Sequence, residues 1–192
     1  TLLSRVRAPY LINDRELMMT SSLGISIYPD DGLEVSELLR NADTAMYHAK
    51  NQGRNTYSYY QANMKHLVER RLSIEEQMRY GLERGEFSVN YQPKINLTTG
   101  IIMGAEALLR WKNPVLGQIF PDEFIPIAER NGLIIPLGEY VLAEAMRATE
   151  KWLKTCRTEF NIAINISPRQ FREFGLVSFI SKTMESFNLS AE

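Results

Sequence analysis

The sequence predicts an α/β protein made of two parts, and two observations carry this prediction. Residues 87–95 (FSVNYQPKI) alternate between apolar and polar side chains, which is the period of a β-strand with one buried face. After residue 86, predicted strands alternate with segments whose apolar residues recur at helical spacing. Such an order is typical of a parallel α/β sheet or barrel. Residues 1–60 carry a separate, shorter series of strand and helix signals.

The first part, residues 1–60, is expected to contain a helix end, a hairpin, a strand, a long helix and a final strand. Asn13-Asp14 is a plausible turn between two extended runs, and the next strand is expected to stop at Pro29. Apolar residues at intervals of three and four then predict a helix that ends near Gly53. The segment NTYSYY that follows is expected to form a short strand.

Residues 61–85 are expected to be a helical linker that also starts the second domain. An apolar stripe runs through their many charges, formed by Met64, Leu67, Val68, Leu72, Met78 and Leu82. This helix either joins two domains or packs as the first helix of the second one, and the sequence leaves both interpretations open.

The second part, residues 86–192, begins with the strand over 87–95, a turn at LTTG and a second strand, IIMGAEALLRW. Helices are expected around PDEFIPIAERNG and GEYVLAEAMRATEKWLKT. The strand FNIAINIS and a helix from about Leu176 to Phe187 follow. The alternation of strand and helix is what predicts the sheet or barrel.

Composition excludes several classes of protein. With 192 residues, 44% of them hydrophobic, the chain can build a packed core. Its net charge of −1 creates no strong field, so we expect no binding to nucleic acid polymers. Cys156 is the only cysteine, which excludes an internal disulfide and fits a reducing compartment. No apolar run approaches the roughly 20 residues of a spanning helix. We therefore expect a cytoplasmic location, with any inner-membrane anchor of a parent protein outside this segment.

Glu106 is the first candidate for a functional residue, because a carboxylate inside the apolar run MGAEALLRW costs free energy unless something compensates it. On a strand, Glu106 shares one face with Leu108 and Arg110, whereas Ala107 points to the other. The backbones of Glu106 and Arg110 lie roughly 13 Å apart at about 3.3 Å per residue, which makes an ion pair difficult. A carboxylate suits Mg²⁺ or Mn²⁺ and a guanidinium suits a phosphate. The alternative, in which Glu106 caps a loop and Arg110 pairs with a neighbouring acid, stays open.

Two polar side chains on other strands invite a similar choice. Asn165, near the carboxyl end of the strand FNIAINIS, could give an amide oxygen to a metal, or it could bond the backbone as a structural residue. Gln92 could recognise a base, or it could belong to a polar outer face. Functional groups gather where parallel strands end at their carboxyl side, which favours the functional interpretation of Asn165.

At this point the residues carry a family resemblance. The segment YQPKINLTTGIIMGAEALLRWKNPVLGQIFPDEFIPIAERNGLI, together with NISPRQF, resembles the first part of an EAL domain, the cyclic di-GMP phosphodiesterase module, from about Leu72 to Glu192. The segments TSSLGISIYPDDG and LLRNADTAMYHAKNQGRNTYSYY resemble the C-terminal third of a GGDEF domain, the diguanylate cyclase module. The implied fold is the C-terminal part of a GGDEF α/β domain (residues 1–60), a helical linker (61–85) and the first part of an EAL-type (β/α)8 TIM-like barrel (86–192).

The EAL resemblance assigns roles to the candidate residues. It implies that Glu106 and Asn165 are ligands of a catalytic Mg²⁺ or Mn²⁺, that Arg110 contacts a phosphate, and that Gln92 and Leu108 contact the bound dinucleotide. The family hydrolyses cyclic di-GMP to linear pGpG with two metals. Its remaining elements, a further Glu, a paired Asp-Asp, a catalytic Lys and a later Glu, are expected beyond Glu192, so no catalytic set is complete here.

The GGDEF resemblance implies no cyclase activity for this segment. The GG(D/E)EF turn on which the nucleotide site depends is absent from the sequence. Lys50 and Arg54 match positions that touch triphosphate in active cyclases, and we treat them as vestigial contacts. Four residues apart on one helical face, they could equally complement a helix C-terminus.

The sequence therefore predicts a segment of a bacterial cyclic di-GMP phosphodiesterase. The alternatives are an inactive cyclic di-GMP receptor, which binds the dinucleotide without cutting it, and an interaction scaffold. We expect the segment alone to be inactive. A sensory domain upstream and a homodimer are further expectations for the parent protein.

Overall fold

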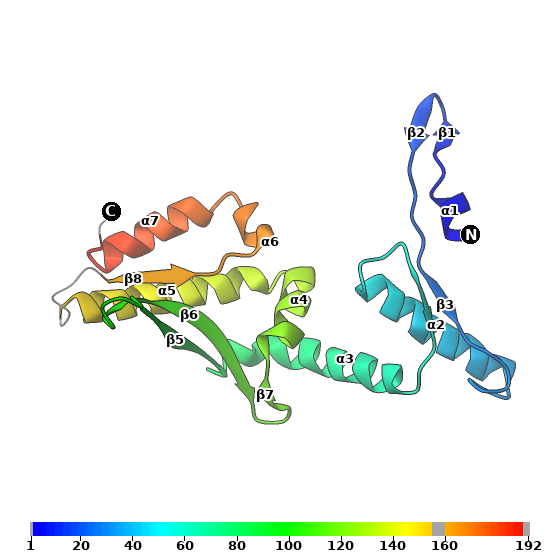
Figure 1. Cartoon of the computed structure of the whole chain (residues 1–192), viewed down its shortest axis with the longest axis horizontal. Coiled ribbons are helices and arrows are strands. Elements are labelled where there is room, and N and C mark those ends of the chain that lie inside the picture. Colours follow the sequence, from blue (N-terminus) through cyan, green and yellow to red (C-terminus); the bar gives the residue numbers. More distant parts are fainter. Residues whose placement is uncertain (1, 155–159, 190–192) are drawn as a thin grey trace. The chain divides into compact units, whose positions relative to one another are not determined.

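The computed structural model describes residues 2–154 and 160–189, and Cys156 lies outside the described residues. The chain divides into two compact units, Thr1–Leu72 (unit 1) and Ser73–Glu192 (unit 2) (Figure 1). In the part of the chain that is described, no helix combines the length and the apolarity needed to cross a membrane.

Unit 1 consists of a hairpin and a small parallel sheet that packs on a long helix. Its elements are α1 (Leu2–Val6), β1 (Tyr10–Ile12), β2 (Arg15–Leu17), β3 (Leu23–Ile25), α2 (Val35–Asn51) and β4 (Tyr57–Tyr59). The antiparallel hairpin β1–β2 turns at Asn13 and Asp14, as the sequence predicts. Strands β3 and β4 are parallel, with α2 as their connection. Gly24 permits this packing, because a Cβ there would lie 1.8 Å from the carbonyl oxygen of Ala42 on α2.

The end of α2 corrects one prediction. The helix ends at Asn51, and Gly53, Arg54 and Asn55 have φ angles of 110°, 61° and 52°. Left-handed backbone of this kind cannot continue a right-handed helix. The prediction that Lys50 and Arg54 share one helical face is therefore wrong, and both side chains are exposed.

Helix α3 (Asn63–Gly81) is continuous, which confirms the expected helix over these residues. Of the predicted apolar stripe, Met64 and Met78 are buried, whereas Leu67 and Leu72 are more than half exposed. Ile74, which the predicted stripe omits, is buried and belongs with Met78 to the core of unit 2. The C-terminal part of α3 thus packs as the first helix of unit 2.

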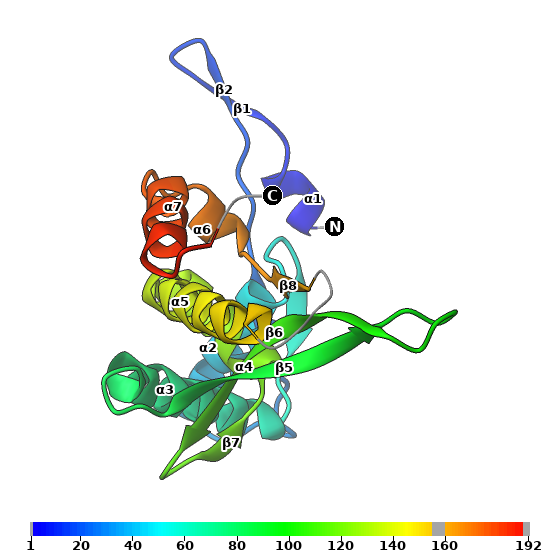
Figure 2. The same cartoon turned by 90° about the vertical axis from the view of Figure 1, so that its left-hand side faces the viewer.

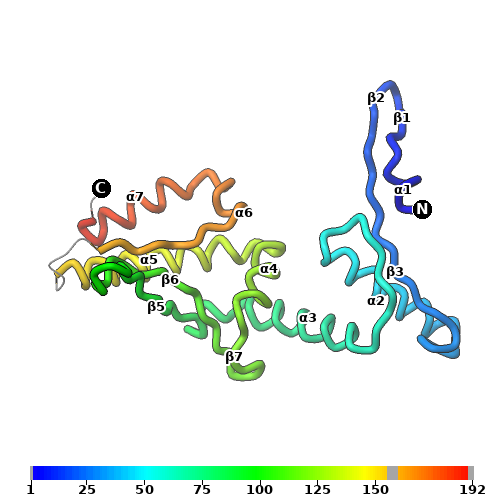
Figure 3. Tube along the Cα trace, in the orientation of Figure 1, coloured from blue at the N-terminus to red at the C-terminus, as the bar shows by residue number. Residues whose placement is uncertain are grey.

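Unit 2 is a four-stranded sheet with helices, and its path can be followed along the tube in Figure 3. After α3 its elements are β5 (Phe87–Ile95), β6 (Ile102–Asn113), β7 (Gly117–Ile119), α4 (Pro121–Asn131), α5 (Ile134–Leu153), β8 (Asn161–Ile164), α6 (Pro168–Phe171) and α7 (Leu176–Ser186). The short β7 and α6 were not predicted. Helix α5 begins about one turn earlier than its apolar pattern suggested.

The sheet is mixed rather than wholly parallel. Strand β8 runs parallel to β6, as predicted, after the crossover through α4 and α5. Strands β5 and β6 are antiparallel because the short LTTG turn joins them directly, and only an antiparallel pair can be closed by so short a connection. Among the described strands, β8 pairs only with β6.

Two groups of buried side chains hold unit 2 together. At one end of β6, Trp111 stacks on Phe87 with ring centroids 5.0 Å apart and meets the edge of Phe124 from α4. Along the middle of β6, α5 covers one face of the sheet (Figure 2). Val141 and Ala145 of α5 pack there with Ala107. The core thus occupies one face of β6 and leaves the opposite face for polar side chains.

Candidate active site

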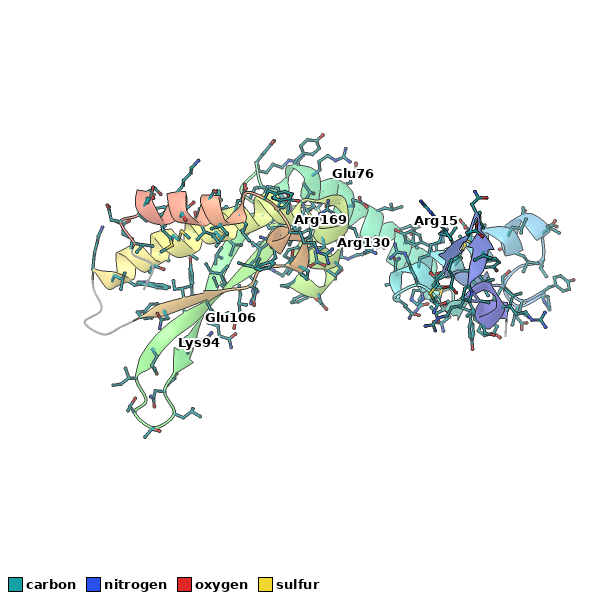
Figure 4. All side chains as sticks on the ribbon, turned by 90° about the horizontal axis from the view of Figure 1, so that it is seen from above. Arg15, Glu76, Lys94, Glu106, Arg130 and Arg169 are labelled. Atoms are coloured by element: carbon teal, nitrogen blue, oxygen red, sulfur yellow. The ribbon has the colours of Figure 1, made fainter. Side chains whose placement is uncertain are left out.

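The candidate site lies on the face of β6 that α5 does not cover. Glu106, Leu108 and Arg110 are half-buried on this face, while Ala105 and Ala107 on the other are buried, so the predicted division of the strand is confirmed. In Figure 4, Glu106 points away from α5 on the same side as Lys94 of β5. Because Glu106 is only half-buried, its charge costs less free energy than it would in the fully buried strand that the sequence predicted.

Asn165 is brought to Glu106 by the parallel pairing of β6 and β8. Glu106 lies opposite Ala163 in the register, and Asn165 follows two residues later, just beyond the end of β8. Its amide Nδ2 donates a hydrogen bond of 2.7 Å to Oε1 of Glu106. No described Lys or Arg side chain forms an ion pair with Glu106. The partner of this carboxylate within the described chain is thus an exposed amide and not a cation.

The Glu106 and Asn165 side chains fit a divalent cation. Two neighbouring oxygen ligands on one Mg²⁺ are separated by about 3 Å, because each lies about 2.1 Å from the ion. The 2.7 Å between Oε1 and Nδ2 matches this spacing, provided that the amide turns its oxygen toward the ion. Within the described ranges, no group of three or more His, Cys, Asp or Glu side chains could hold a metal. The donor set found here is one carboxylate and one amide.

Arg110 lines two pockets. One is a pocket of about 270 Å³ that it shares with Leu108 and Asn165. Ala107 and apolar residues of α4 and α5 also line this pocket, so it extends to the side of the strand that α5 covers. The other, of about 520 Å³, includes Asn90 and Lys112. The Arg110 guanidinium donates to the carbonyl oxygen of Leu109 and forms no ion pair with a described acid. Most of its donors therefore remain available, and the predicted pairing with a neighbouring acid is not seen in the described chain.

Gln92 lies next to Glu106 across the β5–β6 hairpin. The two residues are direct partners in the antiparallel register, so their side chains share a face. The Gln92 side chain is exposed. The structure thus brings Gln92, Glu106, Leu108, Arg110 and Asn165 to one face of one sheet. Lys50 and Arg54 belong to unit 1.

The turn that follows Asn165 contains functional groups that the sequence reasoning missed. Ser167 caps α6: its Oγ accepts from the backbone N–H of Gln170, and the side chain of Gln170 accepts from the backbone N–H of Ser167. Arg169 donates to the carbonyl oxygens of Glu129 and Arg130 at the end of α4, where Figure 4 shows Arg130 and Arg169 together. The pattern Ser-x-x-Gln in SPRQ is a capping-box signal and could have revealed this turn.

Two tyrosines anchor the opposite face of the sheet. Burial, and after it the charge of Glu144, raises the pKa of Tyr91, whose hydroxyl donates to the backbone carbonyl of Glu144 at 3.0 Å. The pKa of Tyr140 is raised by the same causes, and its hydroxyl donates to the carbonyl of Phe87. Both phenols stay neutral near pH 7 and tie α5 to the sheet.

A carboxylate within β6 and an amide just beyond the end of the neighbouring parallel strand β8, beside an arginine-lined pocket, are groups that suit a divalent cation and a phosphate. Residues 75–192, more than half of the chain, match the family described as "EAL domain", and residues 1–56 match "Diguanylate cyclase, GGDEF domain". The chain therefore belongs to the EAL domain family and carries a GGDEF segment ahead of the EAL domain. The predicted resemblance is confirmed.

Relatives share this domain order. The chain is 42% identical over 183 residues to the bifunctional diguanylate cyclase/cyclic di-GMP phosphodiesterase MucR of Pseudomonas aeruginosa, covering 95% of this chain and 27% of that protein. It is 34% identical over 187 residues to the cyclic di-GMP phosphodiesterase PdeR of Escherichia coli, covering 97% and 28%. The chain thus spans about a quarter of the length of these relatives.

Solved structures support the same fold. The structure described as "PaMucR Phosphodiesterase, c-di-GMP complex" matches with a TM-score of 0.59 and 40% identity, over 61% of this chain and 47% of that one. The cAMP-bound form of the EAL enzyme Bd1971 matches with a TM-score of 0.57 and 32% identity, over 66% and 37%. The fold of unit 2 is thus part of an EAL-type TIM-like barrel.

Proposed function

We propose that this chain is part of a cyclic di-GMP phosphodiesterase that hydrolyses the dinucleotide to linear pGpG with the help of Mg²⁺ or Mn²⁺. The observation that carries the proposal is the contact between Glu106 and Asn165 across β6 and β8, next to the pocket of Arg110. The names of MucR and PdeR, and the cyclic di-GMP complex of a 40% identical structure, support the choice of substrate.

Each residue of the site has a part in this proposal. Glu106 and Asn165 would hold a divalent cation, which when bound activates water and offsets the charge that develops on the phosphate. Arg110 would grip a phosphate through two parallel hydrogen bonds, for which its planar guanidinium is suited. Leu108 would supply an apolar wall, and Gln92 would donate to or accept from the dinucleotide beside Glu106. In the overall reaction water adds to one phosphorus and one P–O bond of the ring breaks.

The complete protein is expected to need more than this chain. Two oxygen donors, with waters, hold at most one loosely bound cation, whereas the proposed hydrolysis uses two. We therefore propose that residues 1–192 alone neither hydrolyse nor synthesise cyclic di-GMP. A sensory domain, a homodimer and a cytoplasmic location are further parts of the proposal. The greater length of the relatives supports additional domains.

The substitution Glu106→Gln in the complete protein tests the proposal. It removes the charged ligand and keeps the size of the side chain, so Mn²⁺-dependent formation of pGpG should fall by at least about 100-fold. Glu83→Gln, an exposed glutamate of the same unit, is the matched control and should leave turnover unchanged. Near-native turnover of the Glu106→Gln protein, measured by chromatography of pGpG, would remove Glu106 from the site.

The binding role of Arg110 needs a separate measurement. Arg110→Lys keeps the charge and loses the planar fork, so calorimetry should show weaker binding of cyclic di-GMP. Unchanged affinity would remove Arg110 from the proposed site. If the native protein binds the dinucleotide but yields no pGpG, the receptor alternative replaces the enzyme.

A further inference from the structure

Asn165 lies one residue beyond the strand pairing that brings it near Glu106. Strand β8 ends at Ile164, so the backbone of Asn165 lies outside the β6–β8 ladder. Its side chain is exposed, and its contact is the hydrogen bond to Glu106. Strand pairing therefore brings Asn165 near Glu106, and the turn that follows Asn165 can hold it at the distance that a shared cation requires.

Gln170 closes the turn directly after Asn165. Its side-chain oxygen accepts from the backbone N–H of Ser167 at 3.1 Å, and its own N–H donates to Oγ of Ser167 at 3.3 Å. Gln170 is only 5% exposed, so its side-chain amide is buried where it closes the capping box of α6. The reciprocal pair fixes the backbone two residues beyond Asn165.

The closed turn is also tied to both helices that wall the pocket. A Cβ added at Gly138 of α5 would lie 1.7 Å from Nε2 of Gln170, so the glutamine fits against bare helix backbone. Arg169 reaches the carbonyl oxygens at the C-terminal end of α4. Helices α4 and α5 contribute Ile125 and Val141 to the pocket that contains Arg110 and Asn165. The turn is therefore held by the same two helices that line the pocket beside Glu106.

We propose that Gln170 is a positioning residue that holds Asn165 against Glu106 for binding of a divalent cation. The proposal rests on the proposed function, because it takes Glu106 and Asn165 as the cation's ligands. Gln170 also lines the pocket of Arg110 and Asn165, and the proposal gives it the role of positioning Asn165 and not of contacting the substrate. Residues that orient metal ligands typically change metal affinity by 10- to 100-fold when they are replaced.

Two substitutions at Gln170 separate positioning from packing. Gln170→Met keeps the length of the side chain and removes the oxygen that Ser167 N–H requires. Gln170→Glu keeps an oxygen at that place. In the complete protein, Mn²⁺ binding is measured by electron paramagnetic resonance well below the unfolding temperature, together with KM and kcat for cyclic di-GMP. We expect the Kd for Mn²⁺ to rise about 10-fold or more in Gln170→Met, to rise less than about 3-fold in Gln170→Glu, and KM to stay near native.

Gly138→Ala disturbs the same Gln170 contact from the side of α5, and it replaces Gln170→Met as the test if that variant does not fold. The new methyl group must displace the Gln170 side chain, so Mn²⁺ binding should weaken in the same direction. Gly175→Ala is the matched control, because a Cβ there meets nothing within 4 Å. It should bind Mn²⁺ like the native protein.

The outcomes distinguish the two proposals. A native protein that neither binds Mn²⁺ nor forms pGpG contradicts the proposed function. A native protein that does both, with Gln170→Met or Gly138→Ala binding Mn²⁺ equally well, overturns the positioning role alone. Equal losses in Gln170→Met and Gln170→Glu would also overturn it, since the oxygen that accepts from Ser167 would then not preserve Mn²⁺ binding.

Discussion

Unit 1 and unit 2 bury different kinds of side chain. In unit 2 the core contains Trp111 and Phe124, both fully buried, together with Ile119. In the described residues of unit 1, the buried side chains are Asn41, Ala45, Ala49 and Met64. Unit 1 also exposes many large apolar residues, among them Leu11, Ile12, Met18, Tyr28, Leu33 and Val35.

The difference shows where the candidate site gets its rigidity. Strand β6 is held by aromatic packing at one end and by α5 in the middle, so its exposed face is backed by a core. The sheet of unit 1 is joined to α2 by a close backbone contact at Gly24 and by small side chains. Buried apolar area contributes about 25 cal/mol per Å², so we expect unit 1 to open at a lower free energy than unit 2.

Trp111→Ala should cause the largest loss of unfolding free energy, and it would remove most of the difference in stability between unit 2 and unit 1. Truncation of a buried Trp costs about 3–5 kcal/mol of unfolding free energy. The chain's two tryptophans, Trp111 and Trp152, both lie in unit 2, so the fluorescence of Trp152 still reports its unfolding in urea. A loss below about 1 kcal/mol would contradict the central place given to Trp111.

Gly24→Ala should break the main contact of unit 1. The added Cβ would overlap the carbonyl oxygen of Ala42, and overpacking of this kind costs about 1–3 kcal/mol. Hydrogen exchange of the α2 amides, residues 35–51, should become faster, while exchange in α5 stays unchanged. Gly175→Ala is the control, because a Cβ at Gly175 meets no atom within 4 Å, and it should leave exchange in α2 unchanged. Unaltered exchange in α2 would show that β3 and α2 do not meet as described.

Tyr91→Phe should change how the stability of unit 2 depends on pH. Burial raises the pKa of Tyr91, so the folded chain keeps this proton at a pH where the unfolded chain, with a pKa near 10.0, loses it. The resulting stabilisation is complete below about pH 10 and is lost as pH rises through the folded pKa. Urea midpoints between pH 9 and 11 should therefore fall less steeply in Tyr91→Phe than in the native chain. Tyr57→Phe, at an exposed position, should leave the slope unchanged.

Leu11→Ala should have the smallest effect. Leu11 is 75% exposed, and substitutions at such positions stay within about 0.5 kcal/mol. Leu137→Ala is the matched change in unit 2, where the side chain is 2% exposed and the expected loss is about 2–5 kcal/mol. Equal losses at the two positions would contradict the contrast between the units.

The sequence predicted those helices, strands and turns that show a regular apolar repeat or a typical turn residue. The hairpin at Asn13 and Asp14, the strand over 87–95 and the long helices follow from such signals, and the structure confirms them. The pattern also placed Glu106 and Arg110 on one face of β6. It failed at α3, where Ile74 is buried and Leu67 is not, because the buried stripe of a helix depends on what packs against it.

The sequence by itself determined the family and the strand face that carries Glu106, Leu108 and Arg110, and it predicted roles for Gln92 and Asn165 through the family resemblance. Those conclusions depend on residues close together in the chain or on motifs in a fixed order. The family resemblance implied that Glu106 and Asn165 lie close together, whereas only the tertiary structure showed the hydrogen bond that joins them across 59 residues and the fit of Gln170 against Gly138. Both contacts join residues that are far apart in the sequence, where no repeating pattern predicts a contact. The register of β6 and β8 brings Asn165 to Glu106, and the packing of α6 against α5 brings Gln170 to Gly138.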